Sequence, residues 1–279
     1  MNLPATLLPS SFVCATGLFG AYAYSHFSKD VPILMYHRVA DIPHDRLSVH
    51  PEQFDAQLAF LRGHGYHTIS IAQLQTHLTT GTPLPKKPVI LTFDDGYDNN
   101  FTNALPIMKK HGMTGTVFVI SDWVGKANDW ENYRNKPACR TMSWEQLREW
   151  HQSGMEIGSH TVNHPHLSGL SDEDITEELV RSKATIEDKL AIPINSLAYP
   201  YGDFDERVRR QVMAAGYNTA IAIYTGVPIW HNDLFALRRN IIASTNSLKA
   251  FSSKVSPWHP VLIGLRQLEQ RIRIKRRKR

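Results

Sequence analysis

Two adjacent carboxylates, Asp94 and Asp95, follow a short apolar segment in the sequence Pro88-Val-Ile-Leu-Thr-Phe-Asp-Asp-Gly-Tyr97. The segment is rich in β-branched residues and has no polar alternation, a pattern typical of a strand buried on both faces. Gly96 then allows a tight turn. Ligands of parallel α/β folds bind at the carboxyl ends of strands, so the two acids are candidate functional residues. The alternative is a solvated Asp-Asp-Gly turn.

Two histidines four residues apart, His160 and His164, follow another predicted strand in the sequence Ser159-His-Thr-Val-Asn-His164. On a helical turn this spacing places both imidazoles on one face, where they can share a metal ion. Two histidines and one carboxylate leave coordination positions open for water and substrate. The second Asp of the pair is then free to act as a base on water that attacks a carbonyl group. The alternative is a pair of surface histidines.

Strand and helix patterns alternate along the chain, which predicts a parallel sheet that is closed or nearly closed. Strands are predicted near residues 31–37, 68–71, 89–93, 115–120, 154–160, 196–201, 219–223 and 237–242. Helices are predicted near residues 54–61, 73–78, 99–111, 143–151, 172–190 and 204–215.

Composition separates a globular body from a basic tail. The 279 residues are 42% hydrophobic and 20% charged, and the net charge is +5. Seven of the 31 basic residues lie in Arg271–Arg279, so the rest of the chain holds 24 basic and 26 acidic residues. The body therefore gives no reason to expect nucleic-acid binding. Cys14 and Cys139 form no CxxC pair, which argues against a disulfide framework or a cysteine zinc site.

The N-terminal residues 1–28 contain no Asp, Glu, Lys or Arg. Their most apolar part, Phe12–Tyr24, is shorter than the ~20 residues that a membrane span needs. Ala21-Tyr22-Ala23 fits the small-x-small pattern of a signal-peptide cleavage site, although no basic residue precedes it. We expect a signal peptide or anchor at 1–28, a catalytic domain at 29–264 and a basic tail at 265–279. A soluble N-terminal arm is the alternative for the first segment.

Three segments in order, Thr92–Gly96, Ser159–His164 and Ala198-Tyr-Pro-Tyr-Gly202, resemble the motifs of the polysaccharide deacetylases, carbohydrate esterase family 4. Their order and spacing extend the resemblance over at least residues 31–242. The resemblance implies a distorted (β/α) barrel with about seven parallel strands. It also implies a metal-dependent enzyme that removes N-acetyl groups from amino sugars.

The resemblance also implies roles for individual residues. Asp94 would be the general base, and Asp95, His160 and His164 would bind a divalent metal. Zinc is the expected ion, with nickel or cobalt as substitutes. The backbone N–H of Tyr201 would stabilise the negative charge that develops on the carbonyl oxygen.

This chain departs from the common family pattern in two places. Many members have an Arg two residues before the Pro-Tyr pair, where this chain has Ala198. We expect Arg239 to replace it as the residue that orients the base, with Arg238 as the rival. A C-terminal Leu-x-His that supplies the acid is also missing. Leu34-Met-Tyr-His37 resembles instead the branch that contains the poly-β-1,6-N-acetylglucosamine deacetylases, which makes His37 the candidate acid; a core histidine is the alternative.

The expected substrate is an N-acetylated polysaccharide or a lipid-linked sugar. A deformylase, an amidase of small molecules and a non-catalytic carbohydrate-binding protein are the alternatives, and the complete Asp and His set argues against the last. The uncharged N-terminal segment and the basic tail together predict contact with a membrane surface. We therefore expect the protein in the bacterial cell envelope, periplasmic or membrane-associated, with the cytoplasm as the alternative.

Overall fold

The computed structural model describes residues 31–128, 139–223, 233–256 and 259. The predicted N-terminal segment 1–28, the tail 265–279 and part of the loop 121–140 lie outside these residues.

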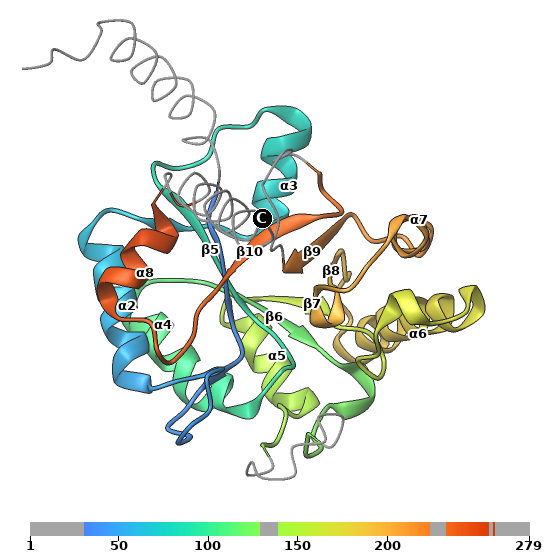
Figure 1. The fold of residues 1–279 in the computed structure, drawn as a ribbon, viewed down its shortest axis with the longest axis horizontal. Coiled ribbons are helices and arrows are strands. Elements are labelled where there is room, and N and C mark those ends of the chain that lie inside the picture. Colours follow the sequence, from blue (N-terminus) through green and yellow to red (C-terminus); the bar gives the residue numbers. More distant parts are fainter. Residues whose placement is uncertain (1–30, 129–138, 224–232, 257–258, 260–279) are drawn as a thin grey trace, which may run out of the picture. The chain divides into compact units, whose positions relative to one another are not determined.

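Seven parallel strands close into a barrel, as Figure 1 shows. Around the ring they follow the order β1, β10, β9, β8, β7, β6, β5, and β5 pairs again with β1. Their bounds are β1 Ile33–Tyr36, β5 Pro88–Phe93, β6 Thr116–Val119, β7 Glu156–Ser159, β8 Ser196–Ala198, β9 Thr219–Ile223 and β10 Leu237–Ile241. A further short strand, β4 His67–Thr68, pairs with the start of β5. The predicted seven-stranded (β/α) barrel is confirmed.

Helices pack around this barrel (Figure 1). They are α2 Pro51–Gly63, α3 Ile71–Thr80, α4 Leu105–His111, α5 Trp144–Gln152, α6 Asp172–Leu190, α7 Glu206–Ala214 and α8 Leu248–Val255. Ser143 and Gln146 form a capping box at the start of α5. Among the described residues, no helix is long and apolar enough to cross a lipid bilayer.

Some predicted boundaries were wrong, and some short elements were missed. β8 ends at Ala198, and Pro200–Gly202 form a short 3₁₀ turn, η4, instead of extending the strand. The helix predicted near 99–111 begins as a π-helical turn, η1 Asn100–Ala104. A pair of two-residue strands, β2 Arg38–Val39 and β3 Ser48–Val49, and helix α8 were not predicted.

Alternate side chains of the strands face two separate cores. Ile33, Ile90, Phe118 and Leu237 belong to one buried cluster, which fills the barrel. Their neighbours along the strands, such as Leu34, pack in the other cluster, between the barrel and the helices. Any side chain that follows the inward register at the carboxyl end of a strand therefore enters the mouth of the barrel.

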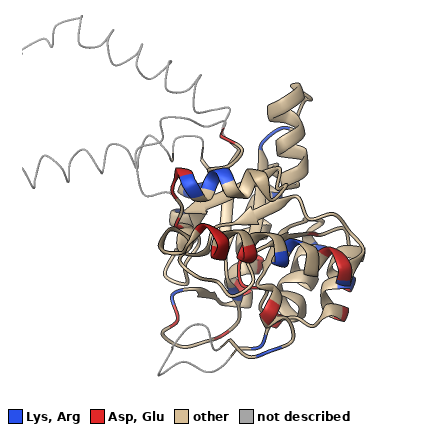
Figure 2. Cartoon of the chain, turned by 90° about the vertical axis from the view of Figure 1, so that its right-hand side faces the viewer, with Lys and Arg blue, Asp and Glu red and all other residues tan. Residues whose placement is uncertain are grey.

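Charged residues of both signs share the helices that surround the barrel. In the view of Figure 2, red and blue segments lie close together on the same helices. This agrees with the near-neutral balance of the sequence outside the basic tail.

Candidate metal centre and active site

Asp95, His160 and His164 meet at the mouth of the barrel. The Oδ1 atom of Asp95 lies 3.6 Å from His160 Nε2 and 3.7 Å from His164 Nε2, and the two Nε2 atoms are 3.2 Å apart. Two imidazole nitrogens bound to one tetrahedral zinc ion stand about 3.3 Å apart, given Zn–N bonds of about 2.0–2.1 Å. All three side chains are buried. The donor set and its spacing fit one divalent ion.

Both imidazoles are neutral, so each can offer a nitrogen lone pair to a cation. His160 Nδ1 donates to the carbonyl oxygen of Ala198 at 2.7 Å, which directs Nε2 and its lone pair at the cluster. Burial lowers the pKa of His160, although the Asp94 carboxylate opposes this shift. Burial, followed by the charge of His160, lowers the pKa of His164 to about 2. Neither ring needs to lose a proton to bind a cation at neutral pH.

The expected helical turn between the two histidines was wrong. Residues 160–164 form an irregular loop after β7, in which Thr161 has φ +68° and His164 has φ +60°. Neither residue is glycine, so both adopt a backbone conformation that side chains disfavour. The imidazoles converge because the loop folds back, and not because of helical periodicity.

Asp94 forms a bidentate ion pair with Arg239 of β10. Arg239 Nη1 donates to Asp94 Oδ1 at 2.5 Å, and Nη2 donates to Oδ2 at 2.7 Å. Burial alone would raise the pKa of Asp94, but the charges of Arg239, His160 and His37 lower it to about 2. Asp94 therefore stays ionised, and its orientation is fixed. Arg238 is the preceding residue of the strand, and strand alternation turns it to the other face.

His37 follows β1 on a segment that three asparagines hold. Asn100 Nδ2 donates to the carbonyl oxygen of His37 at 2.9 Å. The N–H of Val39 donates to Asn99 Oδ1 at 3.0 Å, and Asn103 Nδ2 donates to the Val39 carbonyl at 2.8 Å. The sequence analysis did not single out these asparagines, although three of them within the five residues 99–103, shortly after the Asp pair, were a usable signal.

The His37 side chain is partly exposed, and its charge state depends on its neighbours. Burial, together with the positive charges of Arg38 and Arg239, lowers the pKa of His37 to about 4. The negative charge of the Asp94 carboxylate opposes this downward shift. The imidazole is therefore neutral at pH 7 in the metal-free protein.

Tyr201 lies beside the cluster of Asp95, His160 and His164. Its ring centroid is 4.5 Å from that of His164, and on another side it stacks with His166 at 4.0 Å. Tyr201 has φ +58°, and the following Gly202 has φ +69°. A Cβ on Gly202 would lie 2.8 Å from Ile223 Cβ, so the close approach of the chain requires glycine there.

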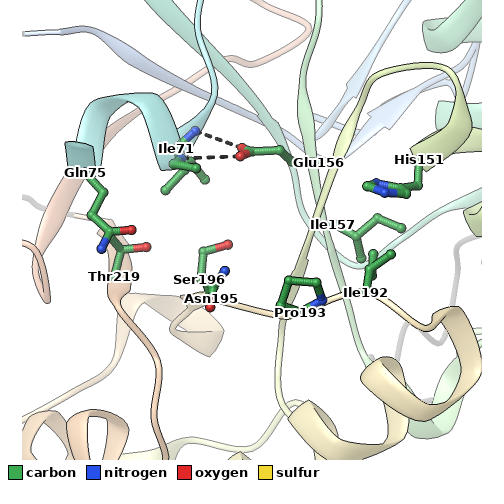
Figure 3. A pocket seen from close by; sticks show the side chains of 11 residues that line it. Ile71, Gln75, His151, Glu156, Ile157, Ile192, Pro193, Asn195, Ser196 and Thr219 are labelled. Carbon is green, nitrogen blue, oxygen red and sulfur yellow. Dashed lines mark hydrogen bonds between the residues drawn. The ribbon is translucent and has the colours of Figure 1, made fainter. Parts of the chain in front are cut away.

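The cavity in Figure 3 lies at the opposite end of the barrel. It has a volume of about 180 Å³, and its lining includes Glu156, Ser196 and Thr219, which begin or lie near the beginning of β7, β8 and β9. The Glu156 carboxylate accepts hydrogen bonds from the N–H groups of Ile71 at 2.8 Å and Ala72 at 3.3 Å. Glu156 therefore caps α3. The cavity is separate from the cluster of Asp95, His160 and His164 at the carboxyl ends of the strands.

Comparison with known proteins places this geometry in a family. Residues 81–220 match the family described as polysaccharide deacetylase. The chain belongs to this polysaccharide deacetylase family. It is therefore an enzyme, a hydrolase of carbon–nitrogen bonds other than peptide bonds, and the family depends on a metal.

Similar proteins include two named poly-β-1,6-N-acetyl-D-glucosamine N-deacetylase. The Staphylococcus aureus protein is 28% identical over 220 residues, which cover 76% of this chain and 72% of that protein. The Escherichia coli protein is 26% identical over 255 residues, which cover 80% of this chain but only 38% of the larger relative. Among solved structures, the Streptococcus pyogenes deacetylase PplD in complex with acetate has a TM-score of 0.72 and 28% identity, and the match covers 82% of this chain and 99% of that one.

Proposed function

We propose that this deacetylase removes N-acetyl groups from a β-1,6-linked N-acetylglucosamine polymer or a closely related lipid-linked sugar. The observation that carries the proposal is the ionised Asp94, fixed by Arg239, directly beside the Asp95, His160 and His164 cluster. The relatives named above and the position of His37 near the N-terminus support the β-1,6 linkage.

Asp95, His160 and His164 would hold the metal, and we propose zinc, with nickel or cobalt able to replace it. The mixed nitrogen and oxygen donors suit these borderline ions better than magnesium or calcium. When bound, the ion polarises the acetyl carbonyl group and lowers the pKa of water.

In the proposed reaction, Asp94 accepts a proton from the water that attacks the carbonyl carbon. Arg239 keeps both carboxylate oxygens in place during this step, so no orientation is lost at the moment of reaction. The backbone N–H of Tyr201 donates to the oxygen on which negative charge develops. The C–N bond then breaks, and acetate and a free amine leave.

The amine nitrogen must receive a proton as the C–N bond breaks, and His37 would deliver it. Because the resting imidazole is neutral, it must first accept a proton. Once protonated, the imidazole donates to the amine nitrogen, which is the more basic of the two groups.

Acetate release from matched oligosaccharides tests the substrate. The metal-loaded full-length protein is incubated with β-1,6-linked and β-1,4-linked N-acetylglucosamine pentamers, an N-acetylated glycolipid and an N-formyl amine. We expect the β-1,6 pentamer to be turned over at least tenfold faster than the others. Faster release of formate from the N-formyl amine would instead favour the deformylase. Faster acetate release from the glycolipid would identify a lipid-linked sugar as the substrate.

We further propose that the enzyme works in the bacterial envelope, attached to a membrane surface. The uncharged segment 1–28 and the seven basic residues of Arg271–Arg279 support this. Each basic residue contributes about 1 kcal/mol at an anionic surface, so seven could give a weak attachment that an apolar segment would strengthen. Fractionation of the full chain and of chains lacking 1–28 or 266–279 tests it; all three in the cytoplasmic fraction would contradict the proposal.

A further inference from the structure

The loop that carries both histidines does not have the regular hydrogen bonds of a helix. Thr161 and His164 both have positive φ, and the residues between them form bends. Strained backbone of this kind persists only where surrounding groups fix it. Within the loop, His164 N–H donates to Thr161 Oγ1 at 3.0 Å, and further groups come from outside it.

Glu178 of α6 holds the middle of the loop. Its Oε2 atom accepts hydrogen bonds from the N–H groups of Val162 at 2.8 Å and Asn163 at 2.9 Å. Its Oε1 atom accepts a third from Asn163 Nδ2 at 2.9 Å. One side chain thus binds two of the three N–H groups between the two metal-binding histidines.

Ser182, one turn further along α6, holds the start of the loop. Its hydroxyl donates to the Thr161 carbonyl at 3.0 Å and lies 2.8 Å from the hydroxyl of Ser159. Residues four apart share one face of a helix, so Glu178 and Ser182 form one surface against the loop.

The rest of the buried face of α6 is apolar. Ile175, Leu179 and Ile186 are fully buried there, whereas Glu178 is 9% exposed and Ser182 is inaccessible. A buried carboxylate is costly unless hydrogen bonds compensate it, and ordinary helix packing does not require one. Glu178 accepts three hydrogen bonds, all from Val162 and Asn163 of the loop between the two histidines, and this points to a role in the geometry of that loop.

We infer that Glu178 is a positioning residue for the metal site: it holds residues 161–163 so that His160 and His164 face one ion before the ion arrives. This inference rests on the proposed function, because it assumes that the two histidines bind the metal. Glu178 itself touches neither the metal nor the substrate. Residues outside the ligand set that orient the ligands typically change metal affinity about 10–100-fold when they are removed.

The chemistry of Glu178 provides a conservative variant. In Glu178→Gln the amide oxygen can still accept from both backbone N–H groups. The new NH₂ group can donate to the side-chain oxygen of Asn163 if the Asn163 amide flips by 180°. Glu178→Ala removes all three hydrogen bonds. The two variants therefore differ in hydrogen bonding to the loop, while both lose the negative charge.

The test measures metal affinity of the full chain by competition with a chromophoric chelator, together with the visible spectrum of the Co²⁺ form. We expect Glu178→Ala to bind Zn²⁺ about 10–100-fold more weakly with an altered Co²⁺ spectrum, and Glu178→Gln to stay within about threefold of the parent. Ile186→Ala, a buried change on the same helix away from the loop, is the control: it should lower the melting temperature and leave affinity unchanged.

Parent-like affinity in Glu178→Ala would overturn the inference. So would equal losses of affinity in Glu178→Ala and Ile186→Ala, or a Gln variant as weak as the Ala variant. If Glu178→Ala does not fold, Glu178→Asp, which is one methylene shorter, takes its place with the same expectation. A parent protein that binds no divalent metal would instead contradict the proposed function, and the inference with it.

Discussion

Arg239 on β10 binds both carboxylate oxygens of Asp94, which follows β5, and β1 lies between these two strands. The two residues are 145 positions apart in the sequence, and both are almost fully buried. The barrel thus brings a fixed cation to the candidate base from β10, in a chain that has Ala198 where many members of the family have an Arg.

Arg239→Lys should lower turnover about tenfold to 100-fold while metal binding is kept. A lysine ammonium cannot hold two carboxylate oxygens as a planar guanidinium does, so Asp94 loses its fixed orientation. Arg238→Lys, one residue earlier, is the matched control and should stay near parental turnover. Steady-state kinetics and metal analysis of both proteins check this. A larger loss in Arg238→Lys would reverse the assignment.

The metal-free protein should lose stability as the pH falls from about 6.5 toward 4. Burial lowers the folded-state pKa of His37 to about 4, whereas an unfolded histidine titrates near 6.5. Between these values the unfolded chain binds a proton that the folded chain does not, so acid favours unfolding. The contribution of His37 is about 2 kcal/mol at pH 5.

Urea unfolding at pH 7.5, 6 and 5 measures this effect. In His37→Gln the loss of stability between pH 7.5 and pH 5 should be smaller than in the parent. It should not vanish, because burial also lowers the pKa values of His160 and His164. An identical pH dependence in the two proteins would show that His37 is not held neutral by its surroundings.

Asn100→Ala should reduce turnover about tenfold without releasing the metal. The change removes the hydrogen bond to the His37 carbonyl, and a bond of this kind contributes about 1 kcal/mol. Thr102→Ala is the control, because Thr102 is exposed on the same π-helical turn. Equal turnover in the two variants would mean that the asparagine does not position the His37 segment.

Gly202→Ala should lower the free energy of unfolding by about 1–3 kcal/mol and also reduce turnover. Its new Cβ would approach Ile223 Cβ to 2.8 Å and Ile223 N to 2.9 Å at a φ of +69°. Relief of this clash must move the neighbouring Tyr201. Gly169→Ala is the control, since no atom lies within 4 Å of a Cβ there. Chemical denaturation that found both variants equally stable would contradict this account.

Local sequence signals predicted the regular elements well. The charged amphipathic pattern of residues 172–190 predicted the bounds of α6. In the structure the Ser171 side chain accepts from Asp174 N–H and caps the helix. β9 was predicted at residues 219–223 from its short apolar run. β2 and β3 were missed because two residues cannot show a period of two.

The geometry of the site was less accessible from the sequence. The His160 and His164 spacing suggested a helical turn, yet Glu178 and Ser182 impose a loop from a helix that comes later in the chain. Arg239 was expected to orient the base, with Arg238 as the rival, and spacing alone could not exclude the rival. The inward register of β10 decides between them, and register is a property of the closed sheet.

The most direct test of the central claim measures metal-dependent acetate release in variants that distinguish the roles of Asp94 and Asp95. Protein stripped of metal is titrated with Zn²⁺ while acetate release from the β-1,6 pentamer and bound metal are both measured. The parent should be inactive without metal and reach full activity at one ion per chain. Asp94→Asn should bind the ion but lose at least about 10²-fold in turnover. Asp95→Asn should bind the ion poorly. Full activity of the stripped parent, or parental turnover in Asp94→Asn, would contradict the account.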